Sequence, residues 1–302
     1  MMNGFLRWIV IFALGMMLTA PSAVASREVT DLLGRRVVIP DSPQRVVALA
    51  PSVTEIVFAL GREDRLAAVT RFSDYPPEAR QLPKVGSYIH LDIERIVALQ
   101  PDLCIAIKDG NPKMVVERLD SLNIPVFAVD PRGLDAVGHT LLQIGRLLNA
   151  EDRAKVIALD MKNRIRQVRK RIENAETKPR VFFQIGISPI VSAGNHTFIN
   201  ELIEMAGGFN LARGATPYPR FSREQVLALA PDIIIITSMA RMEVFEQVKA
   251  QWQQWPDLPA SRDNRIHILD SNMFDRPTPR LVKGLEVLAR LIHPELFDTE
   301  KR

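Results

Sequence analysis

Cysteine is nearly absent from this sequence. Only Cys104 is a cysteine among 302 residues, which excludes an internal disulfide and a zinc site built from cysteine thiolates. Histidine is also scarce, and the few histidines lack the close spacing of metal-ligand pairs (His90, His139, His196, His267 and His293). The sequence therefore predicts no metal site made of side chains alone.

Motifs that bind nucleotide phosphates or present an esterase nucleophile are missing as well. The chain has no Gly-x-Gly-x-x-Gly, no Gly-x-x-x-x-Gly-Lys-Ser/Thr and no Gly-x-Ser-x-Gly. Ser52 lies near Glu55, but no histidine is close in sequence, and its position before an apolar-periodic run favours a helix cap. Asp74 and Asp109 fall in predicted loops without a partner for acid–base work. An enzyme is therefore the less favoured class, and we predict no catalytic residue.

Only one run of the chain is both long and apolar. It extends from Trp8 to Leu18 and follows Arg7. The small-x-small pattern of a signal-peptidase site comes after it and ends at Ala25. Because the run is too short to span a bilayer, we expect a signal peptide over residues 1–25, cleaved near Ala25. No cysteine stands there to carry a lipid, so we expect a soluble periplasmic product.

The charge balance is only weakly basic. Lys and Arg number 39 against 35 Asp and Glu, a formal net charge of +4. Much of the positive charge lies between Arg153 and Arg171, where a solvated helix face accounts for it. Since export also argues against nucleic acid as a partner, we expect none.

Apolar strands alternate with amphipathic helices through most of the chain. This pattern is typical of parallel sheets covered by helices. A helical stretch of about 40 Å, at 1.5 Å per residue, interrupts the alternation after a break near Asn149. We therefore predict an α/β protein with two Rossmann-like lobes and a ligand cleft between them, and a single continuous Rossmann sheet is the alternative. The predicted parts are an N-terminal lobe over 26–149, a spine helix over 150–176 and a C-terminal lobe over 177–302.

One phrase of the sequence occurs twice, 130 residues apart. The copies run from Asp92 to Asp102 and from Ser222 to Asp232, and each ends in Pro-Asp. Each copy begins with a helix-capping residue and carries a glutamate two positions later, Glu94 or Glu224. A first-turn carboxylate is favoured by the helix dipole, so capping alone accounts for either glutamate. Their equivalence predicts two similarly built lobes, each offering one carboxylate.

Several segments of the mature chain resemble one protein family, the helical-backbone class of periplasmic substrate-binding proteins of ABC importers. Three further segments resemble its cobalamin-binding members. The general segments are Ala50-Pro-Ser-Val-Thr-Glu55, Phe72-Ser-Asp-Tyr-Pro-Pro77, Leu82-Pro-Lys-Val-Gly86 and the Pro-Asp repeat. The further ones are Phe183-Gln-Ile-Gly-Ile-Ser-Pro189, Ser222-Arg-Glu-Gln-Val-Leu227 and Phe274-Asp-Arg-Pro-Thr-Pro-Arg280.

The resemblance implies a receptor that captures a corrinoid and presents it to the transmembrane subunits of an ABC permease. In that family the ligand lies between lobes that a spine helix keeps in near-fixed relation. One glutamate on each lobe docks onto permease arginines, and these positions fall on Glu94 and Glu224. The resemblance also implies a monomer that needs no cofactor besides its cargo.

The ligand positions of the cobalamin binders carry over in part. Aromatic positions fall on Phe72, Tyr88 and Tyr218, which are still aromatic here. Three further aromatic positions of the family are aliphatic in this chain, at Ile107, Ile185 and Val191. An Asp contact of the family is replaced by Asn272, and its companion arginine is kept as Arg276. These differences leave the ligand open between cobalamin and a precursor such as cobinamide.

Haem and iron siderophores are the alternative ligands. Haem binders of the class often carry a tyrosine directly after the Leu-Pro-x-Val-Gly segment, and here Tyr88 stands two residues after Gly86, with His90 beside it. An anionic iron chelate would need cationic side chains, and four arginines are candidates (Arg71, Arg132, Arg213 and Arg220).

Overall fold

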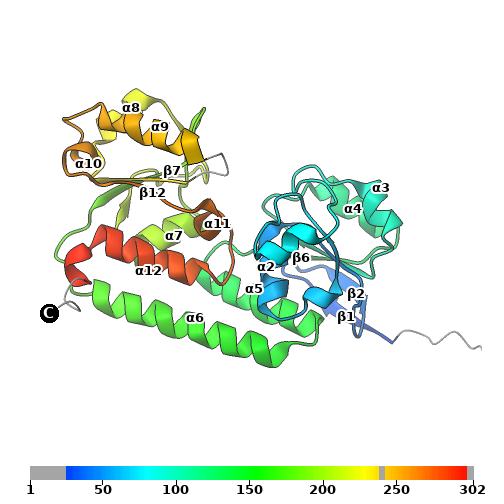
Figure 1. The fold of residues 1–302 in the computed structure, drawn as a ribbon. Helices are drawn as coiled ribbons and strands as arrows, with labels where there is room; N and C mark the ends of the chain where they lie inside the picture. Colours follow the sequence, from blue (N-terminus) through cyan, green and yellow to red (C-terminus); the bar gives the residue numbers. More distant parts are fainter. Residues whose placement is uncertain (1–24, 238–241, 298–302) are drawn as a thin grey trace, which may run out of the picture.

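Two groups of strands and helices, joined by one long helix, make up the computed structural model of the protein (Figure 1). The structure describes residues 25–237 and 242–297, so the expected signal peptide, apart from Ala25, lies outside the described residues. Within these ranges no helix is long and apolar enough to cross a membrane.

The first lobe is built on a parallel sheet with the strand order β4-β3-β5-β6. Its strands are β3 (Val46–Ala48), β4 (Leu66–Val69), β5 (Leu103–Ile107) and β6 (Val126–Val129). Its helices are α2 (Pro51–Ala59), α3 (Ile93–Ala98), α4 (Lys113–Ser121) and α5 (Leu134–Leu147), with the 3₁₀ helices η1 (Glu63–Arg65) and η2 (Pro77–Gln81). An antiparallel hairpin of β1 (Ser26–Thr30) and β2 (Arg36–Pro40) precedes them.

The second lobe is built on a mixed sheet with the order β10-β8-β7-β11-β12, and β9 pairs with β7. Its strands are β7 (Arg180–Gly186), β8 (Ile190–Ser192), β9 (Phe209–Asn210), β10 (Arg220–Phe221), β11 (Ile233–Ile236) and β12 (Ile266–Ile268). Its helices are α7 (Phe198–Met205), α8 (Arg223–Leu229), α9 (Met242–Gln253), α10 (Pro259–Arg262), α11 (Ser271–Phe274) and α12 (Leu281–Ile292), followed by the 3₁₀ helix η3 (Pro294–Leu296).

The two sheets confirm the predicted α/β fold with two lobes. One detail differs, because β8 runs antiparallel between β7 and β10, whereas β7, β11 and β12 are parallel to one another. A short connection after Gly186 turns the chain straight back along β7, and a turn this short can only produce an antiparallel neighbour.

The start of α2 also differs from the prediction. The helix begins at Pro51 with Ala50 as its N-cap, so Ser52 lies inside the first turn and does not cap it. Proline suits this position because its fixed φ is helical and its missing N–H would have no partner in the first turn.

A left-handed residue separates α5 from the spine helix α6 (Glu151–Ile172). Asn149 has a φ of 52°, a conformation that asparagine adopts more readily than most residues, and it lies at the predicted break. Helix α6 packs against α5 on the first lobe and against α7 and α12 on the second (Figure 1).

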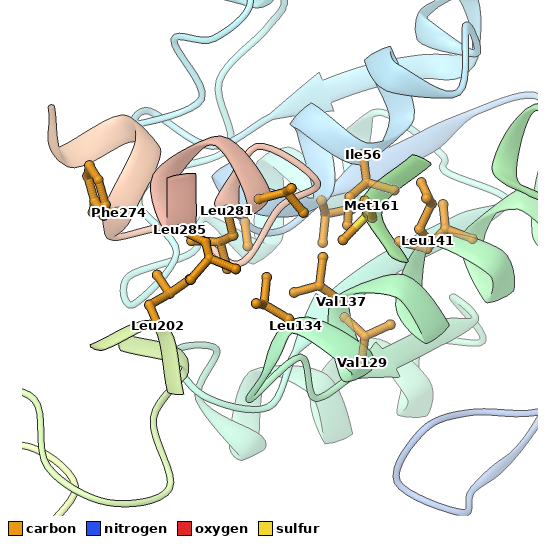
Figure 2. Packing of buried hydrophobic residues seen from close by; sticks show 14 of the residues in the cluster. Ile56, Val129, Leu134, Val137, Leu141, Met161, Leu202, Phe274, Leu281 and Leu285 are labelled. Carbon is orange, nitrogen blue, oxygen red and sulfur yellow. The ribbon is translucent and has the colours of Figure 1, made fainter. Parts of the chain in front are cut away.

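One hydrophobic cluster continues from the first lobe through α6 into the second. Figure 2 shows Met161 of α6 with Val137 and Leu141 of α5, and Leu281 and Leu285 of α12 in the same cluster. Separating the lobes would expose part of this apolar surface, at about 25 cal/mol per Å². The cluster therefore opposes a large hinge movement between the lobes.

Two glycines of α5 offer a test of the packing between α5 and α6. A Cβ on Gly145 would lie 2.6 Å from the Cβ of Ala154, whereas one on Gly138 would meet nothing within 4 Å. Gly138→Ala should raise the free energy of unfolding by about 0.5–1 kcal/mol, because alanine favours the helix. Gly145→Ala should lower it by about 1–3 kcal/mol, because the helices must move apart. Urea denaturation measures both, and changes of the same sign would contradict the packing.

Candidate ligand-binding cleft between the lobes

A cleft of about 370 Å³ lies between the two lobes. Residues that follow the carboxyl ends of β5 and β6 form one wall, and the end of β7 with the loops of the second lobe forms the other. In open α/β sheets ligands bind at these strand ends. The lining includes Ser52, Tyr88, Ile107, Asp109, Gly110, Asp130 and Arg132 from the first lobe, and Ile185, His196, Phe198, Tyr218, Asp275 and Arg276 from the second.

Five predicted ligand positions line this cleft. Tyr88 and Ile107 come from the first lobe, and Ile185, Tyr218 and Arg276 come from the second. The lining thus combines two tyrosines with aliphatic side chains, a combination that suits one large flat ligand with both polar and apolar parts.

Tyr88 is held by close neighbours. Its ring meets the ring of Phe72 edge-on, with centroids 6.2 Å apart. Gly110 also lies against the Tyr88 ring, because a Cβ at Gly110 would lie 2.9 Å from it, and Gly110 has a φ of 139°. Only glycine meets both requirements without strain. Burial raises the pKa of Tyr88, and the nearby Asp275 and Asp109 raise it further.

Tyr218 connects the two lobes across the cleft. Its hydroxyl donates to Oδ2 of Asp109, at 3.3 Å. Burial, with the charge of Asp109, raises the pKa of Tyr218 to about 12, so the phenol stays protonated and remains a donor at neutral pH. Both residues stand out in the sequence, but nothing in the sequence pairs them.

Three of the predicted ligand positions are not part of this lining. The Phe72 ring packs edge-on against Tyr88, and the Phe72 carbonyl accepts from Nη2 of Arg276 at 2.9 Å. Val191 belongs to β8 and pairs there with Gly186. Asn272 lies in α11, and its carbonyl accepts from Nη2 of Arg280 at 2.8 Å. A direct contact between any of the three and a ligand remains a prediction.

Arg276 is engaged by the first lobe rather than free in the cleft. Its Nη1 lies 3.0 Å from Oε1 of Glu55, and its Nη2 lies 2.7 Å from Oδ1 of Asp74. Arg280 reaches the other oxygen of Glu55 at 2.7 Å and stacks over the Tyr75 ring at 3.6 Å. The Glu55 side chain is 3% exposed. Burial raises the pKa of this carboxyl, while Arg280 and Arg276 pull it down.

Sequence analysis missed this ion-pair network. In the sequence Glu55 stands out only as a neighbour of Ser52 and as the end of a family segment, and Asp74 only as an unpaired loop carboxylate. No local signal could have found the pairing, because Glu55 and Arg276 lie 221 residues apart.

Two further carboxylates of the cleft have contrasting environments. Asp130 pairs with Nζ of Lys108 at 3.2 Å and with Nε of Arg132 at 2.8 Å. Asp275 accepts only from the hydroxyl of Thr237, at 2.8 Å, among the described side chains. Burial raises the pKa of Asp275 to about 7.

The residues proposed for haem or siderophore binding lie mostly outside the cleft. His90 is exposed and not in the lining, whereas His196, which had no assigned role, is in it. Arg71 and Arg213 lie over aromatic rings, 5.0 Å from Phe72 and 4.2 Å from Phe209. Of the four candidate arginines, Arg132 alone lines the cleft.

The repeated phrase forms the same local structure in both lobes. The side chains of Asp92 and Ser222 accept from the backbone N–H groups of Arg95 and Gln225, at 2.9 and 3.2 Å, and so cap α3 and α8. Glu94 and Glu224 therefore stand in the first turns of these helices, and both are exposed. Figure 1 shows α3 and α8 on the side of the molecule away from α6.

The Pro-Asp ends of the repeat anchor each helix to a strand. Asp102 accepts from the backbone N–H of Arg45 at 2.9 Å, and Asp232 accepts from that of Arg180 at 2.7 Å. The same arginine side chains donate to the carbonyls ending each helix, at 2.6 and 2.8 Å. Caps and anchors thus explain much of the repeat, but neither needs a glutamate at position 94 or 224.

The pKa of Asp275 gives a stability prediction. Its folded-state value of about 7 exceeds the usual 3.8, so the folded protein binds this proton more tightly than the unfolded chain. The contribution of Asp275 to stability therefore falls as pH rises through this interval. Asp275→Asn cannot ionise and still accepts from Thr237. The melting temperature of the variant minus that of the wild type should be larger at pH 8 than at pH 5, and an equal difference would contradict the assignment.

Relatives of known name share both the sequence and the fold. A family model described as "Periplasmic binding protein" matches residues 46–273. The vitamin B12-binding protein of Vibrio parahaemolyticus serotype O3:K6 (strain RIMD 2210633) is 34% identical over 244 residues, which are 80% of this chain and 86% of that protein.

Solved structures of two ligand classes resemble this one equally well. The periplasmic vitamin B12 binding protein BtuF of Vibrio cholerae has a TM-score of 0.76 at 28% identity and covers 84% of this chain and 98% of its own. A periplasmic heme binding protein from Pseudomonas aeruginosa has a TM-score of 0.76 at 29% identity and covers 83% and 93%. Because the family model spans most of the chain, this protein belongs to the periplasmic binding protein family.

Proposed function

We propose that this protein captures a corrinoid, cobalamin or a close precursor, in the cleft between its lobes. It then delivers the ligand to an inner-membrane ABC permease without changing it chemically. The main support is that tyrosines from both lobes, Tyr88 and Tyr218, line the same cleft together with Ile107 and Ile185. The names of the relatives, vitamin B12-binding proteins among them, point to the same ligand.

The geometry suits a large flat macrocycle. Tyr88 and Tyr218 lie on opposite lobes, so a ring system inserted between the lobes contacts apolar surface on both faces. Ile107 and Ile185 add aliphatic surface, which suits the saturated rim of a corrin as well as an aromatic face does. The continuous core between the lobes keeps the two walls near this spacing and reduces the ordering cost of binding.

Glu94 and Glu224 are proposed as the contacts with the permease. Both are exposed first-turn residues on equivalent helices, and the local structure around them is accounted for without them. Hydrogen bonding to Ser222 lowers the pKa of Glu224, so this carboxylate stays charged. Carboxylates paired with arginines across an interface orient the partners and speed their encounter.

Haem is the second candidate ligand. Tyr88 and His196 both line the cleft, and either residue type can bind haem iron. A siderophore is less well supported, because Arg71 and Arg213 are stacked on rings and Arg132 is paired with Asp130.

Titration of the purified mature protein with cyanocobalamin and with haemin distinguishes the candidates. We expect saturable calorimetric binding of cyanocobalamin at micromolar concentration or below. Tyr218→Ala should weaken it about tenfold, equivalent to about 1.4 kcal/mol, because an apolar wall is lost. Tyr218→Phe keeps the ring and is the matched control, with affinity near that of the wild type. Binding of haemin alone would overturn the corrinoid assignment.

Charge reversal tests the docking role. Glu94→Lys combined with Glu224→Lys should leave corrinoid affinity unchanged and abolish uptake through the cognate permease, because like charges would then face each other. Glu117→Lys with Glu173→Lys makes the same charge change at exposed positions elsewhere and should preserve uptake. A loss of ligand affinity in the first pair would show that the two glutamates act on the pocket instead.

A further inference from the structure

The charged groups in the cleft do not cancel one another. Three carboxylates line it, those of Asp109, Asp130 and Asp275, against the two guanidinium groups of Arg132 and Arg276. The pairing of these groups decides what charge a ligand meets.

Both cations are already occupied by carboxylates of the protein. Arg276 holds Glu55 at 3.0 Å and Asp74 at 2.7 Å. Its Nη2 also donates to the Phe72 carbonyl. Its side chain is 7% exposed, so little of the guanidinium can reach a ligand. Arg132 holds Asp130 at 2.8 Å, and Lys108 adds a second cation to Asp130 at 3.2 Å. Both guanidinium groups of the lining are therefore held by carboxylates of the protein. The one positive charge in excess belongs to the Asp130 cluster and comes from Lys108, whose side chain is 51% exposed and which is not in the lining.

Two carboxylates of the lining make no salt bridge among the described residues. Arg132 acts on Asp109 and Arg276 acts on Asp275 only at longer range, and both arginines are bonded to other carboxylates. Asp109 has the Tyr218 hydroxyl at 3.3 Å, and Asp275 has the Thr237 hydroxyl at 2.8 Å. Each hydroxyl supplies one donor, whereas a carboxylate has about four acceptor positions. Among the described residues no salt bridge neutralises either group. They also lie on different lobes, so a ligand held between the lobes meets one carboxyl from each side.

We propose that Asp109 and Asp275 set the specificity of the cleft, favouring a macrocycle with uncharged carboxamide side chains over one with carboxylate side chains. This inference rests on the proposed function and names the chemistry that the site selects. A carboxamide supplies two N–H donors to a carboxylate, whereas a ligand carboxylate would place two negative charges side by side in a partly desolvated site. Specificity of this kind comes from repelling the wrong ligand as much as from binding the right one.

The environment of Asp275 supports this role. Burial already disfavours its ionised form, and its pKa of about 7 records that cost. A second anion nearby would add to it, whereas an amide lowers it by donating a hydrogen bond. Asp270 and Arg276 are the other charged groups acting on Asp275, and Tyr88 faces it from the first lobe.

Two corrinoids that differ only in these groups make the test direct. The probes are dicyanocobyrinic acid, with carboxylates around the ring, and its heptaamide. Calorimetric titration of the mature protein at pH 8 and fixed ionic strength gives the ratio of their dissociation constants. We expect the wild type to bind the heptaamide at least tenfold more tightly. Asp109→Asn combined with Asp275→Asn should reduce that ratio at least fivefold, mainly by improving the binding of the acid.

A variant with the same change in net charge separates local from overall electrostatics. Glu117→Gln with Asp152→Asn also removes two carboxylates, both on exposed helix faces outside the cleft. It should leave the ratio at the wild-type value. Circular dichroism and thermal melting confirm that each variant is folded before its ratio is used.

The outcomes distinguish this inference from the proposed function. The inference is overturned, with corrinoid binding left intact, if the wild type binds the two corrinoids with equal affinity. It is also overturned if Asp109→Asn with Asp275→Asn gives the same ratio of dissociation constants as Glu117→Gln with Asp152→Asn. If the wild type binds neither corrinoid, the proposed function fails. Haemin, which carries carboxylates, and its diamide are then titrated in the same way. Preference for the diamide then supports the inference, whereas preference for haemin, or binding of neither, overturns it.

Discussion

A buried carboxylate between two arginines is the interaction on which the geometry of the cleft depends. Glu55 belongs to the first lobe, Arg276 and Arg280 belong to the second, and each oxygen of Glu55 has a guanidinium within 3.0 Å. Separating the lobes here would break both of these charge-assisted contacts at once, and the contacts fix how the lobes are oriented. Asp275 directly precedes Arg276, and the same contact therefore fixes a carboxyl in the wall of the cleft.

The ion-pair network of Glu55 and the hydrophobic cluster both hold the two lobes together. The cluster joins the lobes through α5, α6 and α12 on the side of the spine helix (Figure 2), and the ion pairs join them at the cleft. Apolar burial supplies non-directional stability, whereas the arginine–carboxylate contacts fix orientation. Together they describe a receptor whose binding walls are largely formed before the ligand arrives.

The repeated phrase has parts that the fold explains and a pair of glutamates that it does not require. Its capping residues and its Pro-Asp ends have clear local tasks, because they satisfy free N–H groups at helix starts and tie each helix to the strand beside it. Neither task requires a glutamate, although Glu224 is hydrogen-bonded to the capping residue Ser222. A capping position can be recognised from sequence because its chemistry is local. A role of an exposed residue in contacting another protein cannot be recognised from the contacts within its own fold.

The sequence by itself determined the elements and their order. The isoleucines of Ile233–Ile236 and the apolar run Leu103–Ile107 are buried strands because no other environment suits them, and Asn149 ends a helix because it tolerates a left-handed backbone. Tertiary structure alone decided the partners. It placed Tyr218 on Asp109 and Glu55 between two arginines, and it brought Asp275, which sequence analysis had passed over, to the cleft. Such contacts join residues about one hundred to more than two hundred positions apart, and local periodicity carries no information at that distance.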